Sequence, residues 1–159
     1  MSGKLPLRNT GCSLLYLLRA LGRSYLEPDE KLDSVLGIAP KLQKRRKICC
    51  LLFDADNTLF SHHAAKAEKK TIAKLRELAR QFKMAIVSNA PSGERAGQLE
   101  RYFNAEKGFN FYVVRTRTRK PCPEPFLEAL GHLGAKPKEA AMVGDKLFTD
   151  IAGARMLGI

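Results

Sequence analysis

The feature that most constrains this chain is an unbroken apolar run, Cys49 to Phe53, followed by two carboxylates, Asp54 and Asp56. A continuous apolar run of this length is typical of a strand covered on both faces in a parallel α/β sheet. Side chains at i and i+2 of an extended segment point the same way, so both carboxylates are expected to enter one crevice at the strand's carboxyl end. Two anions held this close require a cation or a shared proton, which indicates chemistry rather than folding.

The composition favours one basic domain. A chain of 159 residues with 45% apolar and 28% charged residues is long enough for a core and is typical of a globular protein. The net charge of +12 predicts an anionic partner, such as nucleic acid, an acidic membrane surface or a phosphorylated substrate. No apolar run reaches the length needed to cross a bilayer.

We interpret residues 1–47 as a basic N-terminal helical extension and linker, and residues 48–159 as the main domain. The spacing of leucines predicts a helix near the N-terminus, made by Leu14, Leu15, Leu18 and Leu21. This helix has three open interpretations: it packs on the domain, lies on an anionic membrane as an amphipathic helix, or belongs to a transit peptide. A second short helix is expected near Pro28, with Leu32, Val35 and Leu36 facing inward. The run 41–47, with five cations, is either a solvated linker or a membrane-facing segment.

The main domain alternates strand and helix patterns, which predicts parallel βαβ units with helices on both faces of the sheet. We expect strands over 48–54, 84–88, 111–115 and 140–143. We expect helices over 64–82, 92–103, 123–134 and 148–157. The gaps between successive strands have no room for an inserted domain.

A residue suited to phosphate chemistry follows each expected strand: Asp54 with Asp56, Ser88 with Asn89, Lys120, and Asp145. Each alone is weak, because Ser-Asn and Gly-Asp pairs are common in turns and most lysines are solvated. Their occurrence in order, each after a strand, predicts a single site at the carboxyl edge of the sheet.

The motifs Asp54-x-Asp56-x-Thr58, Ser88, Lys120 and Gly144-Asp145-x4-Asp150 resemble the four ordered motifs of the haloacid dehalogenase (HAD) superfamily. The resemblance implies a three-layer, Rossmann-like α/β fold and a phosphatase. By it, Asp54 is the nucleophile that forms an aspartyl-phosphate, and Asp56 is the general acid and base. It further implies that Lys120 neutralises charge on the phosphoryl group, and that phosphate contacts come from Ser88, Asn89 and Thr58.

The resemblance also implies Mg²⁺, held by Asp54, Asp145 and the main-chain carbonyl of Asp56, with Asp150 supporting these ligands. The physical reasons agree with this assignment. A carboxylate cannot approach a phosphate dianion unless cations cancel the repulsion, and Mg²⁺ prefers oxygen ligands and bridges carboxylate to phosphate. A covalent step divides one difficult displacement into two easier ones.

The absence of room for a cap domain resembles the capless subclass, whose open site serves large substrates or closes by oligomerisation. Within it, Tyr25-Leu26-Glu27-Pro28-Asp29 and the Arg119-Lys120-Pro121 motif resemble the YqeG-type IIIA phosphatases, a branch similar to the mitochondrial phosphatidylglycerophosphate phosphatases. This resemblance implies phosphatidylglycerophosphate as substrate, peripheral contact with an anionic membrane, and a cytoplasmic location that becomes the mitochondrial matrix side in a eukaryote. The family fold continues into a fifth strand, so we expect the C-terminal strand to be missing and the fourth strand to form a sheet edge.

Three alternatives stay open. Arg115, Arg117 and Arg119 would share one face of an extended strand, where they grip a lipid phosphodiester or form a solvated face. The substrate is otherwise a nucleic-acid end, a phosphoprotein or a phosphosugar. The third alternative is that the protein is not an enzyme but a non-catalytic basic binding or scaffold module.

Overall fold

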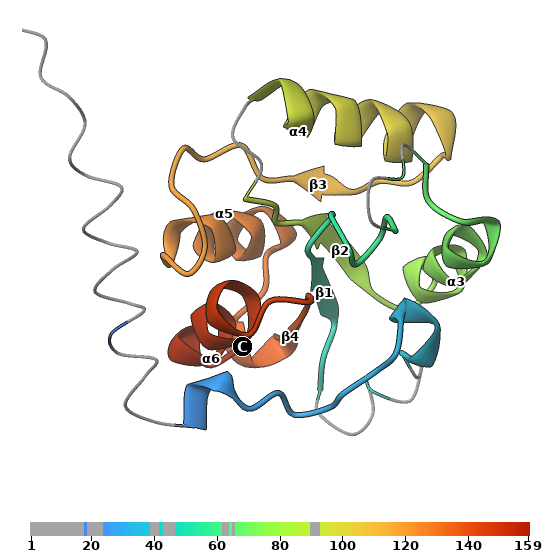
Figure 1. The fold of residues 1–159 in the computed structure, drawn as a ribbon. Coiled ribbons are helices and arrows are strands. Elements are labelled where there is room, and N and C mark those ends of the chain that lie inside the picture. The colour runs from blue at the N-terminus through green and yellow to red at the C-terminus, as the bar shows by residue number, and fades with distance from the viewer. Residues whose placement is uncertain are drawn as a thin grey trace, which may run out of the picture.

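A parallel sheet of four strands forms the centre of the computed structural model, which describes residues 18, 24–38, 42, 47–61, 64, 66–89 and 93–159. The strands lie in the order β3-β2-β1-β4 and are β1 (Cys50–Phe53), β2 (Lys83–Ile86), β3 (Tyr112–Val113) and β4 (Ala140–Val143). All four residues of β1 are buried, because this strand pairs with β2 on one side and with β4 on the other. The predicted parallel α/β sheet is confirmed (Figure 1).

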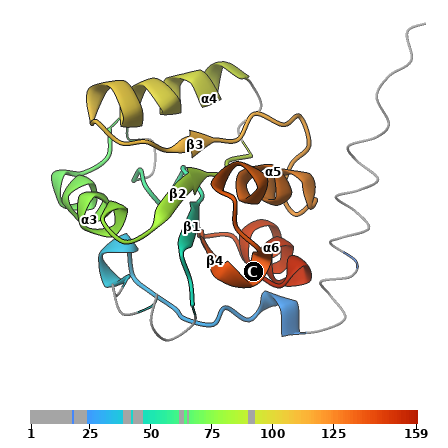
Figure 2. The same ribbon diagram turned by 180° about the vertical axis from the view of Figure 1, so that it is seen from behind.

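Helices cover both faces of the sheet (Figures 1 and 2). Leu51 and Phe53 of β1 pack in one core cluster with α3 (Lys69–Ala79) and α4 (Gly93–Glu100). Cys50 and Leu52 pack in the other cluster with α5 (Glu124–Leu133) and α6 (Ala152–Leu157). This alternation follows from the strand period of two residues, and it explains why β1 is apolar throughout.

Short helical turns complete the chain. Three are 3₁₀ turns: η1 (Ser24–Leu26), η2 (Val35–Gly37) and η4 (Pro137–Glu139). Two are π-helical turns: η3 (Arg101–Glu106), which continues α4, and η5 (Leu147–Ile151), which leads into α6. Helices α5 and α6 end at Gly134 and Gly158, whose φ angles of 64° and 80° require left-handed backbone that glycine adopts without strain.

Several predicted elements are shorter than expected, among them β1, α3 and β3. Helix α3 covers 69–79 rather than 64–82, and β3 has two residues rather than the five of 111–115. The third strand ends early because the main-chain N–H of Arg115 donates to Oε1 of Glu128, at 2.9 Å, instead of continuing the ladder. Arg115, Arg117 and Arg119 would share one strand face only if the strand reached them, and β3 ends before all three.

The segment 24–38 packs on the main domain, with η1 against α6 and η2 against α3. Val35 and Ile38 are buried in the same cluster as Leu51, whereas Leu32 and Leu36 are 45% and 38% exposed. The expectation that both leucines face inward is wrong, because the chain forms only the short 3₁₀ turn η2 here rather than a helix from Pro28, and Leu32 lies before that turn. The predicted leucine-rich helix lies outside the described residues, apart from an exposed Leu18. The boundary at residue 47 stays a prediction.

Strand β4 forms one edge of the sheet that the described residues build. A groove of about 820 Å³ runs beside it, lined by residues 28–35 and by Ala140–Asp145, and it reaches Asn57 at the carboxyl edge. Between β1 and β2, and between β2 and β3, the described chain contains only α3 and then α4 with η3, so no cap domain stands over that edge. Within the described residues, no helix is long and apolar enough to cross a membrane.

Candidate active site

The carboxyl ends of three strands are aligned by main-chain hydrogen bonds. The N–H of Asp54 donates to the carbonyl of Val143, at 2.9 Å, and the N–H of Val87 donates to the carbonyl of Phe53, at 2.8 Å. These bonds continue the ladder one residue past each strand. The residues that follow β1, β2 and β4 therefore emerge at one level, as the sequence pattern predicts.

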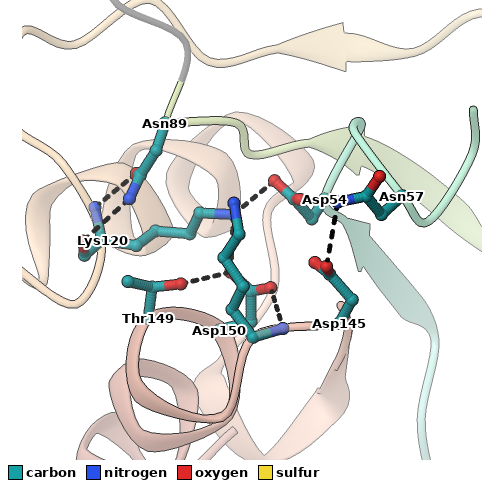
Figure 3. Close-up of polar contacts among 8 residues, drawn as sticks. Asp54, Asn57, Asn89, Lys120, Asp145, Thr149 and Asp150 are labelled. Carbon is teal, nitrogen blue, oxygen red and sulfur yellow. Dashed lines mark hydrogen bonds and ion pairs between the residues drawn. The ribbon is translucent and has the colours of Figure 1, made fainter. Parts of the chain in front are cut away.

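A buried lysine joins two of the acidic groups (Figure 3). Nζ of Lys120 lies 2.7 Å from Oδ1 of Asp54 and 2.8 Å from Oδ1 of Asp150. The three residues are only 3%, 4% and 0% exposed. Burial raises the pKa of the Asp54 carboxyl above its ordinary value, and the Lys120 ammonium opposes that rise. One cation between two carboxylates leaves the cluster with an excess negative charge that suits a metal cation.

Lys120 is positioned from the end of β2. The side-chain amide of Asn89 donates to the carbonyl of Lys120 at 2.9 Å and accepts from its N–H at 2.7 Å. These two hydrogen bonds hold the main chain of Lys120 close to the end of β2, although β3 ends seven residues before Lys120. The predicted contact of Asn89 with the phosphoryl group stays a prediction, and so does that of the half-buried Ser88.

Asp145 completes the acidic group at the end of β4. One carboxylate oxygen each from Asp54, Asp145 and Asp150 lies within 4.8 Å of the other two. Asp145 is exposed and accepts a hydrogen bond from Nδ2 of Asn57 at 3.3 Å, whereas Asp150 accepts from the N–H of Lys146 at 3.1 Å. Oxygen-only donors of this kind fit a hard divalent cation such as Mg²⁺.

The second carboxylate of the pair, Asp56, lies apart from this cluster. Its side chain is 51% exposed, and Oδ1 accepts a hydrogen bond from the guanidinium of Arg95 at 2.8 Å. Nearby, Oγ1 of Thr58 is buried and has no hydrogen-bond partner among the described residues. An unsatisfied buried hydroxyl is uncommon and fits a group that a ligand completes.

Gly144 brings β4 into contact with the site. A Cβ atom there would clash with the carboxylate of the fully buried Asp150. We expect Gly144→Ala to lower the free energy of unfolding by about 1–3 kcal/mol, because the backbone must shift. The same shift would displace Asp145 and lower kcat/KM. Urea unfolding and steady-state kinetics measure both quantities.

Gly97→Ala is the matched control for this prediction, since a Cβ atom at Gly97 of α4 meets nothing within 4 Å. In a helix, this change is expected to stabilise by about 0.5–1 kcal/mol. Equal effects of the two substitutions would show that the contact between Gly144 and Asp150 does not constrain the site.

Two residues of the site were not predicted. Asn57 adopts a left-handed conformation, with φ of 62°, and bonds Asp145; its place in the turn after Asp56 was a usable signal, because Asn favours that conformation. Arg95 lies 39 residues from Asp56 in the chain, and no local pattern distinguishes it from other surface arginines.

This sheet and this cluster of acidic residues with a lysine define a capless phosphatase of the HAD superfamily, and solved structures agree. An HAD phosphatase from Thermococcus onnurineus has a TM-score of 0.51 and 31% identity, covering 59% of this chain and 44% of that protein. An uncharacterised protein from Listeria monocytogenes shares the fold, with a TM-score of 0.54 and 24% identity over 70% of this chain and 75% of that one.

More specifically, the chain belongs to the family described as mitochondrial PGP phosphatase, whose model matches residues 15–159. A curated relative, the probable phosphatase YqeG of Bacillus subtilis, is 28% identical over 137 residues, which cover 86% of this chain and 75% of YqeG. A glyceraldehyde 3-phosphate phosphatase of Methanopyrus kandleri is 37% identical over 93 residues, 56% of this chain and 38% of that protein. The chain therefore spans less than half of this archaeal relative.

Proposed function

We propose that this protein hydrolyses a phosphomonoester through an aspartyl-phosphate on Asp54, and that its substrate is phosphatidylglycerophosphate. The observation that carries the chemical proposal is the buried contact of Asp54 with Lys120 beside Asp145. A carboxylate held by a cation, with a second cation site next to it, can approach a phosphate dianion.

Each residue of the site then has a role. An oxygen of Asp54 attacks phosphorus while the bond to the leaving oxygen breaks, and Asp56 gives its proton to that oxygen. Asp56 next takes a proton from water, which attacks phosphorus and releases inorganic phosphate and the Asp54 carboxylate. Lys120 offsets charge on the attacking carboxylate and the phosphoryl oxygens, and Ser88, Asn89 and Thr58 are the candidates for holding the phosphoryl group.

The metal in this proposal is Mg²⁺, held by the carboxylates of Asp54 and Asp145 and by the main-chain carbonyl of Asp56. Asp150 supports this set through Lys120 rather than as a direct ligand, since it is fully buried and its Oδ1 lies 2.8 Å from Nζ. Bound there, Mg²⁺ supplies positive charge to the transferring phosphoryl oxygens.

Three observations support a lipid substrate. The family model carries the name of a mitochondrial PGP phosphatase, no cap domain stands over the site in the described chain, and the net charge is +12. An open site on a chain with this net positive charge suits a phosphate presented at an anionic membrane. The corresponding location is the membrane surface, on the matrix side in a mitochondrion.

We expect purified protein to hydrolyse an aryl phosphate with Mg²⁺ and to lose this activity when EDTA removes the metal. It should also release phosphate from phosphatidylglycerophosphate in mixed micelles. The same assay is run with a phosphopeptide, a 3′-phosphorylated oligonucleotide and a phosphosugar. A higher kcat/KM for any of these three would refute the lipid substrate, and no hydrolysis of any compound with Mg²⁺ would favour the non-catalytic module.

A further inference from the structure

Arg95 contacts the carboxylate that faces the leaving group. In the proposed mechanism Asp54 meets phosphorus and Asp56 meets the leaving oxygen, so a group bound to Asp56 lies on the leaving-group side of the site. The guanidinium of Arg95 lies 2.8 Å from Oδ1 of Asp56. Any part of the substrate a few bonds beyond the scissile oxygen therefore comes within reach of Arg95.

The guanidinium is held in place by an aromatic cluster. Its Cζ lies 5.4 Å from the ring centroid of Phe60, which is 4% exposed. Phe60 in turn packs against Tyr102 and Phe103, each with a ring centroid 5.5 Å away. A cation over a fixed ring loses little side-chain freedom when it binds an anion, which is the condition for a selective contact.

The ion pair with Asp56 does little for the fold. Both side chains are partly exposed, 30% for Arg95 and 51% for Asp56, and pairs of this kind contribute about 0–1 kcal/mol. Arg95 nevertheless sits in the first turn of α4, a helix that begins at Gly93, and its side chain reaches Asp56, three residues past the end of β1. A guanidinium at such a place, with a planar array of donors, matches the oxygens of a phosphate or carboxylate.

We propose that Arg95 binds an anionic group on the leaving part of the substrate and so selects phosphomonoesters whose alcohol carries a second negative charge. The inference rests on the proposed function, and the group that matches it there is a phosphodiester, which phosphatidylglycerophosphate carries on the far side of its glycerol. Arg95 then acts as a specificity-determining residue, and its contact with Asp56 aligns leaving group and proton donor.

Two water-soluble substrates isolate this contact from membrane binding. Glycerol 3-phosphate has a neutral leaving group, and deacylated phosphatidylglycerophosphate has a leaving group with one phosphodiester. The measured ratio is kcat/KM for deacylated phosphatidylglycerophosphate divided by kcat/KM for glycerol 3-phosphate. We expect Arg95→Ala to lower this ratio about 10- to 100-fold, the loss expected for one charge-assisted hydrogen bond. Arg95→Lys should restore part of the ratio, because it returns the charge without the planar fork.

Arg76→Ala is the matched control. Arg76 also lies over a ring, 6.0 Å from the centroid of Phe109, and also donates one hydrogen bond, to the carbonyl of Lys107. It lies on α3, the helix that leads into the start of β2, at the opposite end of the sheet from the site. We expect this variant to leave the ratio unchanged, so that loss of a positive charge in general is separated from loss of Arg95.

A binding experiment tests the contact without turnover. Calorimetry with Mg²⁺ present measures the affinity of glycerophosphoglycerol and, separately, of inorganic phosphate. We expect Arg95→Ala to weaken the binding of glycerophosphoglycerol and to leave the affinity for inorganic phosphate unchanged. If Arg95→Ala lowered kcat/KM equally on both substrates, Arg95 would instead be a positioning residue for Asp56. If the affinity for inorganic phosphate fell as much as that for glycerophosphoglycerol, Arg95 would instead contact the transferring phosphoryl group. Either result overturns the proposal, as does absence of diester binding to the parent protein. Failure of the proposed function itself appears differently, as lack of hydrolysis or as full activity in Asp54→Asn.

Discussion

Replacing Lys120 by methionine is expected to abolish phosphate-ester hydrolysis and to lower the free energy of unfolding by about 3–5 kcal/mol, the cost of leaving buried charges without their partner. The ammonium of Lys120 is the buried cation within 2.8 Å of both Asp54 and Asp150. Methionine fills a similar volume, so the loss reports charge rather than a cavity. Urea unfolding at pH 7 without divalent metal measures the stability, and an aryl phosphate measures the activity.

The pH dependence of this variant has a definite sign. Without the lysine, burial and the neighbouring charge of Asp150 raise the pKa of the Asp54 carboxyl in the folded state above the value of about 3.9 in the unfolded chain. Stability is then largest below that value and is lost as the pH rises through the folded-state pKa. The deficit of Lys120→Met relative to the parent should therefore shrink toward pH 4.

Two controls accompany Lys120→Met. Lys74→Met removes a lysine whose side chain is 12% exposed and which pairs with a partly exposed Glu77, and it should cost no more than about 1 kcal/mol. The double variant Lys120→Met with Asp150→Asn should recover stability but not hydrolysis. A single variant as stable as the parent would contradict the assignment of a charge-balancing role to Lys120.

Asp54→Asn is expected to reduce kcat by about 10⁴-fold or more, because an amide cannot act as the nucleophile. The same change should stabilise the metal-free protein. Burial raises the pKa of Asp54 above its ordinary value of 3.8, so ionisation of this carboxyl costs the fold free energy. The gain should appear at pH 7 and vanish as the pH falls below the unfolded value, where the carboxyl is protonated in both states.

Asp145→Asn is the matched control for this trade between activity and stability. Asp145 is exposed, so its replacement should weaken Mg²⁺ binding without stabilising the metal-free fold. Thermal unfolding with and without Mg²⁺ measures both effects. If Asp54→Asn were less stable than the parent without metal, the ionised carboxylate would be favourable to the fold and the argument from burial would fail.

The sequence predicts the sheet and the carboxyl edge because the two share one pattern. Apolar runs of four to six residues end abruptly at Asp54, Ser88 and Gly144, and parallel strands place those ends side by side. Strand β4 covers 140–143 as expected, and β1 lies within the expected 48–54.

The parts that the sequence does not predict depend on single long-range bonds. Glu128 ends β3 early by taking the N–H of Arg115, and Asn89 holds the main chain of Lys120. Arg95 reaches Asp56 from a helix whose orientation depends on the packing of Phe60 and Tyr102. Hydrogen-bond partners of this kind leave no periodic trace in the chain.

The pair of hydrogen bonds between Asn89 and Lys120 affects which parts of the chain can change without moving the site. Since the lysine is anchored to β2, the connection over 114–119, with its three exposed arginines, does not set the position of the ammonium. That connection can therefore be shortened, lengthened or exchanged between relatives while the reacting groups stay in register. The main chain of Lys120 is thus anchored independently of this connection, so a change in the length of 114–119 need not displace the cluster of Lys120 with Asp54 and Asp150.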